Sequence, residues 1–240
     1  MTTQILMPMG GLGSRFSQQG YTTPKPLILV DGKAMFMRAL DSFTQLGDDK
    51  TNLFVIRRDQ IEAHAIDKQI QSILPGAKIA VLESDTRGAV ETCLLAESLI
   101  DDTLPVIVAD CDIFFQSKEY VTKILSGNYD GLLLTFESVD PRYSYAEIDG
   151  SGSVVRTAEK VVISNHAILG GYYFSSGKLF KSLAHEFVDN PLPENLKEYY
   201  VSHLFNLMIE RGLRIGIATI DEKHIFGTPE ELEAYNNGKS

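Results

Sequence analysis

Apolar residues alternate along the first half of the chain between short runs and helically spaced stretches. The short runs are typical of buried strands, and they span residues 5–9, 53–56, 79–82 and 105–109. The helically spaced stretches predict helices, and they span residues 33–46, 60–74 and 89–100. Strands that alternate with helices imply right-handed crossovers, so this half predicts a mostly parallel sheet covered on both faces.

The pattern changes near residue 130 and becomes richer in strands. Segments separated by turn residues predict strands over 132–136, 143–148, 153–163 and 167–174. Helical spacing returns over 177–188 and 197–211, and a further strand is expected over 213–219. Near the end, Thr228-Pro229-Glu230-Glu231 predicts a helix start, with Thr228 as N-cap and Glu231 closing a capping box. The prediction is one α/β domain, 1–240, whose second half adds a mixed-sheet region.

The composition is that of an ordinary globular protein. The 240 residues are 44% hydrophobic and 22% charged. A chain of this size buries about 70–75% of its unfolded surface, so it needs no disulfide or metal to stabilise its fold. Two cysteines, Cys93 and Cys111, offer no disulfide framework. No apolar run approaches the roughly 20 residues of a membrane span, and no basic leader precedes the first strand. We therefore expect a cytoplasmic protein with no membrane partner.

The distribution of charge along the chain says more about possible ligands than the net charge does. The net charge of -10 argues against general affinity for nucleic acid, which requires a basic face. Residues 1–30 contain Arg15 and Lys25 but no acidic residue, so the rest of the chain carries -12. A cationic island in an acidic protein suits a compact phosphorylated ligand. Two basic residues in thirty also occur by chance, so charge alone leaves both interpretations open.

A glycine-rich turn, Gly10-Gly11-Leu12-Gly13-Ser14-Arg15, follows the first predicted strand directly. Glycines let backbone N–H groups approach phosphate oxygens with no Cβ in the way, and Arg15 adds a forked cation. The turn is not a dinucleotide-binding motif, because Phe16 stands at the third glycine position. It is not a P-loop either, because no Gly-Lys-Ser/Thr closes it. A tight surface turn is the alternative for such a cluster taken alone.

Two further motifs carry charges that suit a phosphate site. The prolines of Pro24-Lys25-Pro26-Leu27 keep Lys25 on a stiffened loop. Asp110-Cys111-Asp112 follows the predicted strand 105–109, where two carboxylates can hold Mg²⁺ or Mn²⁺ through oxygen ligands. That edge of an open α/β sheet is also where ligands bind. The alternative is a turn in which an aspartate caps the next helix.

Together these motifs resemble the sugar-phosphate nucleotidyltransferases, the nucleoside-diphosphate-sugar pyrophosphorylases, and in particular their short, capsule-biosynthesis members. The resemblance continues through Thr86-Arg87-Gly88-Ala89, Glu159-Lys160, Ser164-Asn165-His166-Ala167 and Gly227-Thr228-Pro229-Glu230-Glu231-Leu232. It implies an α/β fold of three layers, GT-A-like and Rossmann-like, around a central, mostly parallel mixed sheet. It also implies a nucleotide-binding half, 1–130, and a sugar-phosphate-binding half, 131–240.

The resemblance implies a role for each motif. Arg15 and Lys25 are the expected catalytic residues. The expected nucleotide-binding residues are Met9, Gly10, Gly11, Gly13, Ser14, Arg15, Gly88 and Ala89. The expected sugar-phosphate-binding residues are Lys25, Glu159, Lys160 and Asn165. Asp112, with Asp110 as helper or alternative, is expected to hold Mg²⁺ or Mn²⁺.

The implied reaction transfers a nucleoside monophosphate from a nucleoside triphosphate to a sugar phosphate or similar small acceptor, with release of pyrophosphate. The base, the acceptor and the oligomeric state stay open, and a homo-oligomer is compatible with the sequence. Ile225 stands where the family often has a second metal-binding aspartate, and Val161 stands where a proline often follows the Glu-Lys pair. The alternatives are a GT-A-type glycosyltransferase that consumes a nucleotide sugar and a non-catalytic nucleotide-binding homologue.

Overall fold

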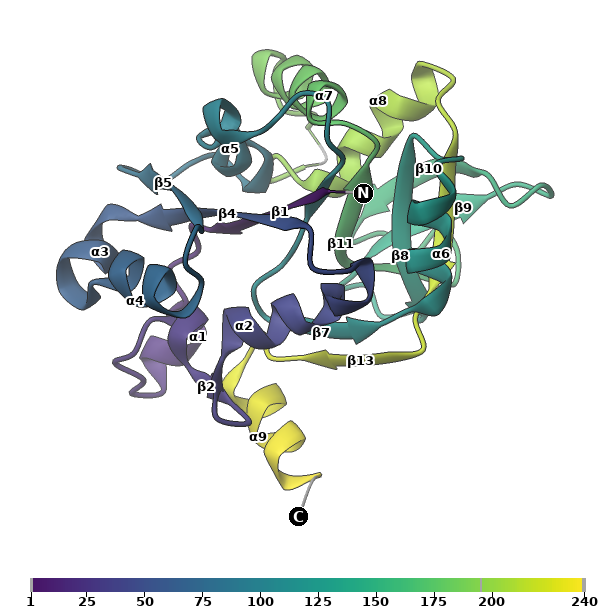
Figure 1. The fold of residues 1–240 in the computed structure, drawn as a ribbon. Helices are drawn as coiled ribbons and strands as arrows, with labels where there is room; N and C mark the ends of the chain where they lie inside the picture. Colours follow the sequence, from purple (N-terminus) through teal and green to yellow (C-terminus); the bar gives the residue numbers. More distant parts are fainter. Residues whose placement is uncertain (1, 195, 239–240) are drawn as a thin grey trace.

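A nine-stranded mixed sheet forms the centre of the protein, and a computed structural model describes it over residues 2–194 and 196–238. Figure 1 shows the sheet between two groups of helices. Its strands are β1 (Thr3–Met9), β4 (Lys50–Arg57), β5 (Lys78–Leu82), β6 (Val106–Val108), β8 (Gly131–Glu137), β9 (Ser144–Ile148), β10 (Val154–Glu159), β11 (His166–Phe174) and β12 (Ile215–Thr219). Two small sheets pair β2 (Leu29–Val30) with β3 (Lys33–Ala34) and β7 (Ile113–Gln116) with β13 (Glu222–Ile225).

The order along the sheet is β10-β9-β11-β6-β1-β4-β5, and β8 lies between β11 and β12. Strand β1 runs parallel to both β4 and β6, and β4 runs parallel to β5. The antiparallel pairs gather around β11, which pairs with β6, β8 and β9. The predicted α/β class and mixed sheet are confirmed. Strands from both sides of residue 130 share one sheet, and the division into two functional halves stays a prediction.

Helices cover both faces of the sheet. The α-helices are α1 (Ser14–Gln18), α2 (Met35–Leu40), α3 (Arg58–His64), α4 (Ile66–Ile73), α5 (Ala89–Leu94), α6 (Lys118–Ser126), α7 (Gly177–Asp189), α8 (Leu204–Glu210) and α9 (Pro229–Asn237). The 3-10 turns are η1 (Lys25–Leu27), η2 (Asp41–Leu46), η3 (Glu97–Leu99) and η4 (Val201–His203). No helix of the described residues is both long enough and apolar enough to cross a membrane.

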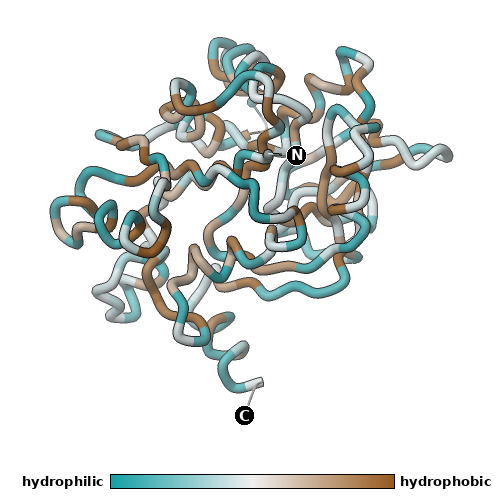
Figure 2. The backbone as a smooth tube through the Cα atoms, viewed as in Figure 1, coloured by the Kyte–Doolittle hydropathy of each residue, from teal (hydrophilic) through white to brown (hydrophobic). Residues whose placement is uncertain are grey.

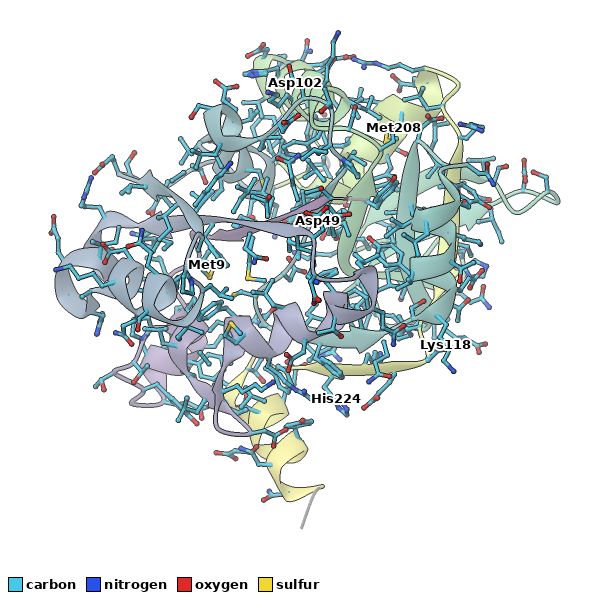
Figure 3. All side chains as sticks on the ribbon, viewed as in Figure 1. Met9, Asp49, Asp102, Lys118, Met208 and His224 are labelled. Carbon is cyan, nitrogen blue, oxygen red and sulfur yellow. The ribbon has the colours of Figure 1, made fainter. Side chains whose placement is uncertain are left out.

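Alternate residues of the central strands point into two separate cores, which makes the fold three-layered. On β1, Met7 packs into the core with α2 and α4, whereas Leu6 packs into the core with α5, α7 and α8. Figure 2 shows hydrophobic segments concentrated along these strands, and Figure 3 shows Met9 and Met208 in the two different layers. Full burial of such a side chain contributes roughly 1.5–3 kcal/mol, so a strand with two apolar faces is held from both sides.

The helix predicted over residues 60–74 is two helices. Ala65 separates α3 from α4 and has a left-handed backbone, with φ of 49°. Ile61 and Ile66 are five residues apart, a spacing that places them on different faces of a continuous helix. The break resets the helical phase, so that Ile66 and Ile70 are both fully buried. The uninterrupted prediction was wrong because burial of this face outweighs the local cost of the break.

Other predicted elements are shorter than their apolar patterns. The stretch 33–46 is β3, α2 and η2, and 89–100 is α5 followed by η3. The stretch 197–211 begins without regular secondary structure and becomes helical only in η4 and α8. The strand predicted over 153–163 ends at Glu159, because Lys160 has a left-handed φ of 55°. In each case apolar spacing marked the buried face correctly and its ends poorly.

The sequence analysis missed β7, α6 and β13, which follow the acidic motif and precede α9. Asp112 leads into a strand, so the interpretation of an aspartate capping the next helix was wrong. Strand β7 pairs with β13, more than a hundred residues later, and this pairing brings Ile225 opposite Ile113. The main-chain N–H of Phe226 donates to the carbonyl of Asp112 at 2.8 Å. The segment formed by β13 and Phe226 therefore lies directly beside Asp110-Cys111-Asp112.

The N-terminus of α9 has only half of the predicted capping box. The Thr228 hydroxyl accepts a hydrogen bond from the backbone N–H of Glu231 at 3.2 Å, as expected of an N-cap. The Glu231 carboxylate instead pairs with Arg142 at 3.0 Å, from the loop between β8 and β9. The glutamate therefore ties the last helix to the second half of the sheet.

Ala65 provides a test of this account of the broken helix. We expect Ala65→Gly to stabilise the protein by roughly 0.5–1 kcal/mol, because glycine adopts the left-handed conformation without a Cβ clash. The matched control, Ala63→Gly inside α3, should destabilise it by about 1 kcal/mol. Urea unfolding of the two variants gives both values. Destabilisation of both to the same extent would contradict the assigned strain at Ala65.

Candidate active site

The candidate site lies at the sheet edge where three parallel strands end. Strand β1 ends at Met9, β4 at Arg57 and β6 at Val108. The segments that follow these strands are the glycine turn, the start of α3 and the acidic motif. Parallel neighbouring strands bring their carboxyl ends to one edge, which is where open α/β sheets bind ligands. Residues 10–15, 57–59 and 110–112 therefore converge.

The glycine turn opens onto a cavity of about 420 Å³. Gly13 has a left-handed φ of 62° and precedes α1, and its carbonyl accepts a hydrogen bond from Phe16 N at 2.9 Å. Gly11, Ser14 and Arg15 line the same cavity. The side chain of Arg15 is exposed at its rim. The turn thus presents backbone groups and an exposed guanidinium to one cavity.

Lys25 links the proline motif to the acidic motif. Its ammonium forms a hydrogen-bonded ion pair with Asp112, and both side chains are only about one-fifth exposed, at 20% and 19%. Burial opposes charging of Lys25, but the neighbouring Asp112 and the other acidic groups raise its pKa overall. Burial raises the pKa of the Cys111 thiol to about 12, so this cysteine stays protonated. The predicted phosphate-binding lysine and metal-binding aspartate are therefore each other's partners.

Asp110 lines the same cavity as Asp112. Burial, followed by repulsion from Asp112, raises the pKa of the Asp110 carboxyl to about 7. A Cβ at position 170 would lie 2.0 Å from the Asp110 Oδ2, so Gly170 is required for the carboxylate to fit. A divalent cation would neutralise the repulsion between these carboxylates. Within the described residues no group of three or more His, Cys, Asp or Glu side chains could hold a metal, so at this motif Asp110 and Asp112 are the two candidate carboxylate ligands.

Glu159 and Lys160 lie on the other side of Asp110. The Glu159 side chain is 10% exposed, and its Oε2 accepts hydrogen bonds from the hydroxyls of Ser144 and Ser202. The charge of Glu159 contributes to the raised pKa of Asp110, so the two carboxylates interact. Lys160 Nζ lies 4.0 Å from Glu159 Oε1 and donates to the Tyr200 hydroxyl at 3.3 Å. The predicted sugar-phosphate residues therefore adjoin the predicted metal residues.

Asn165 is not brought into contact with that pair. Its side chain is exposed, and its carbonyl accepts a hydrogen bond from Ser138 N at 3.1 Å. Within the part of the chain that the structure describes, the Asn165 side chain has no hydrogen bond to Glu159 or Lys160. Its expected role stays a prediction.

A second cavity, of about 440 Å³, adjoins the glycine turn on the side of α5. Gly10, Gly88 and Ala89 line it, as expected of a base-binding site. Met9 instead lines a third cavity, of about 360 Å³, together with Asp110 and Asp112. The predicted nucleotide-binding residues thus line three cavities, at the glycine turn, beside α5 and at the acidic motif, and Gly11 lines all three.

The comparisons with known proteins agree with this arrangement. A family model described as nucleotidyl transferase matches residues 4–211. The chain belongs to this nucleotidyl transferase family. It is 26% identical to the bifunctional protein GlmU of Campylobacter jejuni, over 97% of this chain and 52% of that protein. The chain therefore spans about half the length of the GlmU relatives that it matches.

Two further proteins match nearly end to end. The UTP–glucose-1-phosphate uridylyltransferase AglF of Haloferax volcanii is 24% identical over 96% of this chain and 93% of that protein. The crystal structure of a nucleoside-diphosphate-sugar pyrophosphorylase from Vibrio cholerae is 28% identical, with a TM-score of 0.86 over 97% of this chain and 99% of that one. The resemblance of the motifs to this family, and the fold that it implied, are confirmed.

Sequence analysis overlooked Arg57 in this member of the nucleotidyl transferase family. Its guanidinium is 13% exposed and donates to the Gly10 carbonyl at 3.3 Å, to Asp85 at 2.5 Å and to Asp59 at 2.9 Å. It thus joins the glycine turn to the loop before α5, and its partners Gly10 and Asp85 both line the second cavity. Arg57 directly follows the predicted strand 53–56, the same signal that singled out Asp110 after strand 105–109. A basic residue directly after a buried parallel strand is thus as informative as an acidic one.

The buried carboxyl of Asp110 predicts a pH-dependent stability. Its pKa is raised from the ordinary value of 3.8, so the folded state holds a proton that the unfolded state has lost between about pH 4 and pH 7. Stability attributable to this group is therefore present below pH 4 and is lost as the pH rises through 7. We expect Asp110→Asn to raise the melting temperature by several degrees at about pH 8, and to change it little at about pH 4, when a chelator is present.

The matched control is Asp48→Asn at an exposed position. It should change the melting temperature little at either pH. A wild-type melting temperature that rises relative to Asp110→Asn between pH 4 and pH 8 would contradict the burial cost assigned to this carboxylate.

Proposed function

We propose that this chain transfers a nucleoside monophosphate from a nucleoside triphosphate to a sugar phosphate. An acceptor phosphate oxygen attacks the α-phosphorus, a new P–O bond forms, and the bond to the leaving pyrophosphate breaks. The observation that carries the proposal is the convergence of the glycine turn, Arg15 and the Lys25–Asp112 ion pair at one sheet edge, around two cavities that both have Gly11, Gly13 and Lys25 in their lining. The names of AglF and of the pyrophosphorylase support the same chemistry.

The nucleotide side needs positioning and charge neutralisation. The backbone N–H groups of Gly11 and Gly13 bind phosphate oxygens, together with Ser14, and Arg15 swings onto the outer phosphates. When the triphosphate binds, the Lys25 ammonium gives up its ion pair with Asp112 and pairs with a phosphate oxygen instead. The base lies against Gly88 and Ala89 in the cavity beside α5. Met9 and Gly10 contribute through their backbone groups.

The carboxylates of Asp112 and Asp110 fit Mg²⁺ or Mn²⁺, because they are hard oxygen donors whose mutual repulsion a divalent cation removes. When bound, the ion supplies charge neutralisation for the phosphates. The acceptor lies on the side of Glu159 and Lys160. Lys160 binds its phosphate, whereas Glu159, fixed by its two serine partners, accepts hydrogen bonds from its hydroxyls. A phosphate nucleophile is already ionised at neutral pH, so the reaction requires no histidine base.

We also propose that the product is a precursor for surface polysaccharide, made in the cytoplasm. The two cysteines of the chain are free thiols, which suits a reducing compartment.

A pyrophosphate-release assay tests the function. Four ribonucleoside triphosphates are combined with a panel of sugar and alditol phosphates in the presence of Mg²⁺. We expect one pair to release pyrophosphate, and Asp112→Asn to lower the rate at least about a hundredfold while the circular dichroism spectrum is retained. Asp102→Asn, in the exposed Lys181 ion pair, serves as control and keeps the rate. Consumption of a nucleotide sugar, or triphosphate binding with no turnover across the panel, would contradict the proposal in favour of a glycosyltransferase or a non-catalytic homologue.

The neighbouring residues Arg57 and Arg58 test whether nucleotide binding depends on the specific contacts of one arginine or on positive surface charge in general. Arg57→Met releases the charge of Asp85 into the second cavity and unties the Gly10 carbonyl, so it should weaken triphosphate binding roughly tenfold. Arg58→Met removes only the exposed ion pair with Glu83 and should leave the affinity unchanged. Isothermal titration with the triphosphate measures both. Equal losses for the two variants would contradict the role assigned to Arg57.

A further inference from the structure

Glu198 lies where the cavity beside α5 meets the cavity at the glycine turn. Among the residues that line these two spaces, Gly11 and Glu198 contribute to both. Gly11 contributes through its backbone, and Glu198 comes from the segment before η4. A ligand that occupies both cavities therefore lies next to both Gly11 and Glu198.

The backbone of the neighbouring Tyr199 fixes this position. Its N–H donates to the Arg87 carbonyl at 3.0 Å, and its own carbonyl accepts from Val90 N at 3.0 Å. A Cβ at position 88 would lie 2.5 Å from Tyr199 N, so Gly88 permits this close approach. The Tyr199 side chain is buried and packs against the Phe187 ring. Glu198 is therefore anchored beside α5, and its side chain alone is free to adjust.

The Glu198 side chain is exposed, at a place where the proposed ligand carries negative charge. Within residues 2–194 and 196–238, the Glu198 carboxylate makes no hydrogen bond or ion pair. It faces a space that is proposed to receive a triphosphate, and a second negative charge there weakens anion binding. A carboxylate only accepts hydrogen bonds, so it is favourable at this place when the ligand offers donors there. The ionised phosphates of a nucleotide have no hydrogen-bond donors to offer.

The pentose of a nucleotide offers those donors. With the base beside α5 and the phosphates at the glycine turn, the pentose lies at the junction between Gly11 and Glu198. The 2′- and 3′-hydroxyls of ribose are two adjacent donors, and acidic side chains recognise ribose hydroxyls in other α/β nucleotide sites. We propose that Glu198 accepts hydrogen bonds from the ribose hydroxyls and makes this enzyme select ribonucleoside over 2′-deoxyribonucleoside triphosphates. The inference rests on the proposed function and specifies its nucleotide substrate.

Direct binding measurements test the inference without turnover. The tightest-binding of ATP, CTP, GTP and UTP is compared with its 2′-deoxy analogue by isothermal titration in Mg²⁺. A hydrogen bond to a charged group predicts a ribo preference of roughly tenfold or more in the wild type. In Glu198→Ala the preference should fall to about one, mainly through loss of ribonucleotide affinity. Glu198→Gln, which keeps an acceptor oxygen, should retain part of it. Glu194→Ala, exposed on the same segment, is the matched control.

The outcomes separate the inference from the function on which it rests. An unchanged ribo-to-deoxy ratio in Glu198→Ala, or an equal gain in affinity for both nucleotides, would show that Glu198 acts by charge repulsion alone and would overturn the inference. Equal affinity of the wild type for both nucleotides would overturn it as well, while leaving the transferase proposal intact. Failure of every triphosphate to bind the wild type would overturn the proposed function itself.

Discussion

The ion pair between Lys25 and Asp112 is the contact on which the candidate site depends. It joins a loop near the start of the chain to the end of β6, and it places a positive charge among three interacting acidic side chains. Removing one member of a pair at this depth leaves a poorly solvated charge, at a cost of roughly 3–5 kcal/mol. The pair therefore stabilises the acidic motif while no ligand is bound. It also keeps Lys25 close to where a phosphate would arrive.

The sheet explains why this pair can form at all. Strand β1 lies between β4 and β6, and both of its faces are buried in separate cores. The strand ends are therefore rigid, and the loops that follow them need little chain to meet at one edge. Arg57 then links the glycine turn to the loop before α5, through its contacts with the Gly10 carbonyl and Asp85. Rigid strands with short, cross-linked loops place charges accurately, which is what a phosphoryl transfer that relies on positioning requires.

Much of the fold could be predicted from the sequence because its signals are local. The runs 5–9, 53–56 and 79–82 contain apolar residues at nearly every position, and they form β1, β4 and the edge strand β5. The ends of helices were predicted less well, as at Ala65, because a helix ends where the burial of the next residues requires it. Strand β13 was missed altogether. Its sequence, Glu222–Ile225, has no strand pattern, and its partner β7 lies more than a hundred residues away.

The candidate site divides in the same way. Taken by itself, the sequence determined the existence of the glycine turn, of Lys25 on a loop restricted by two prolines, and of two aspartates after a buried strand. Each of these features depends on residue types at a fixed, short spacing. Only the tertiary structure decided that Lys25 pairs with Asp112, that Glu159 interacts with Asp110, and that Glu198 stands between two cavities. Those relations join segments up to about 190 residues apart, and electrostatics and burial act through space, so no pattern along the chain records them.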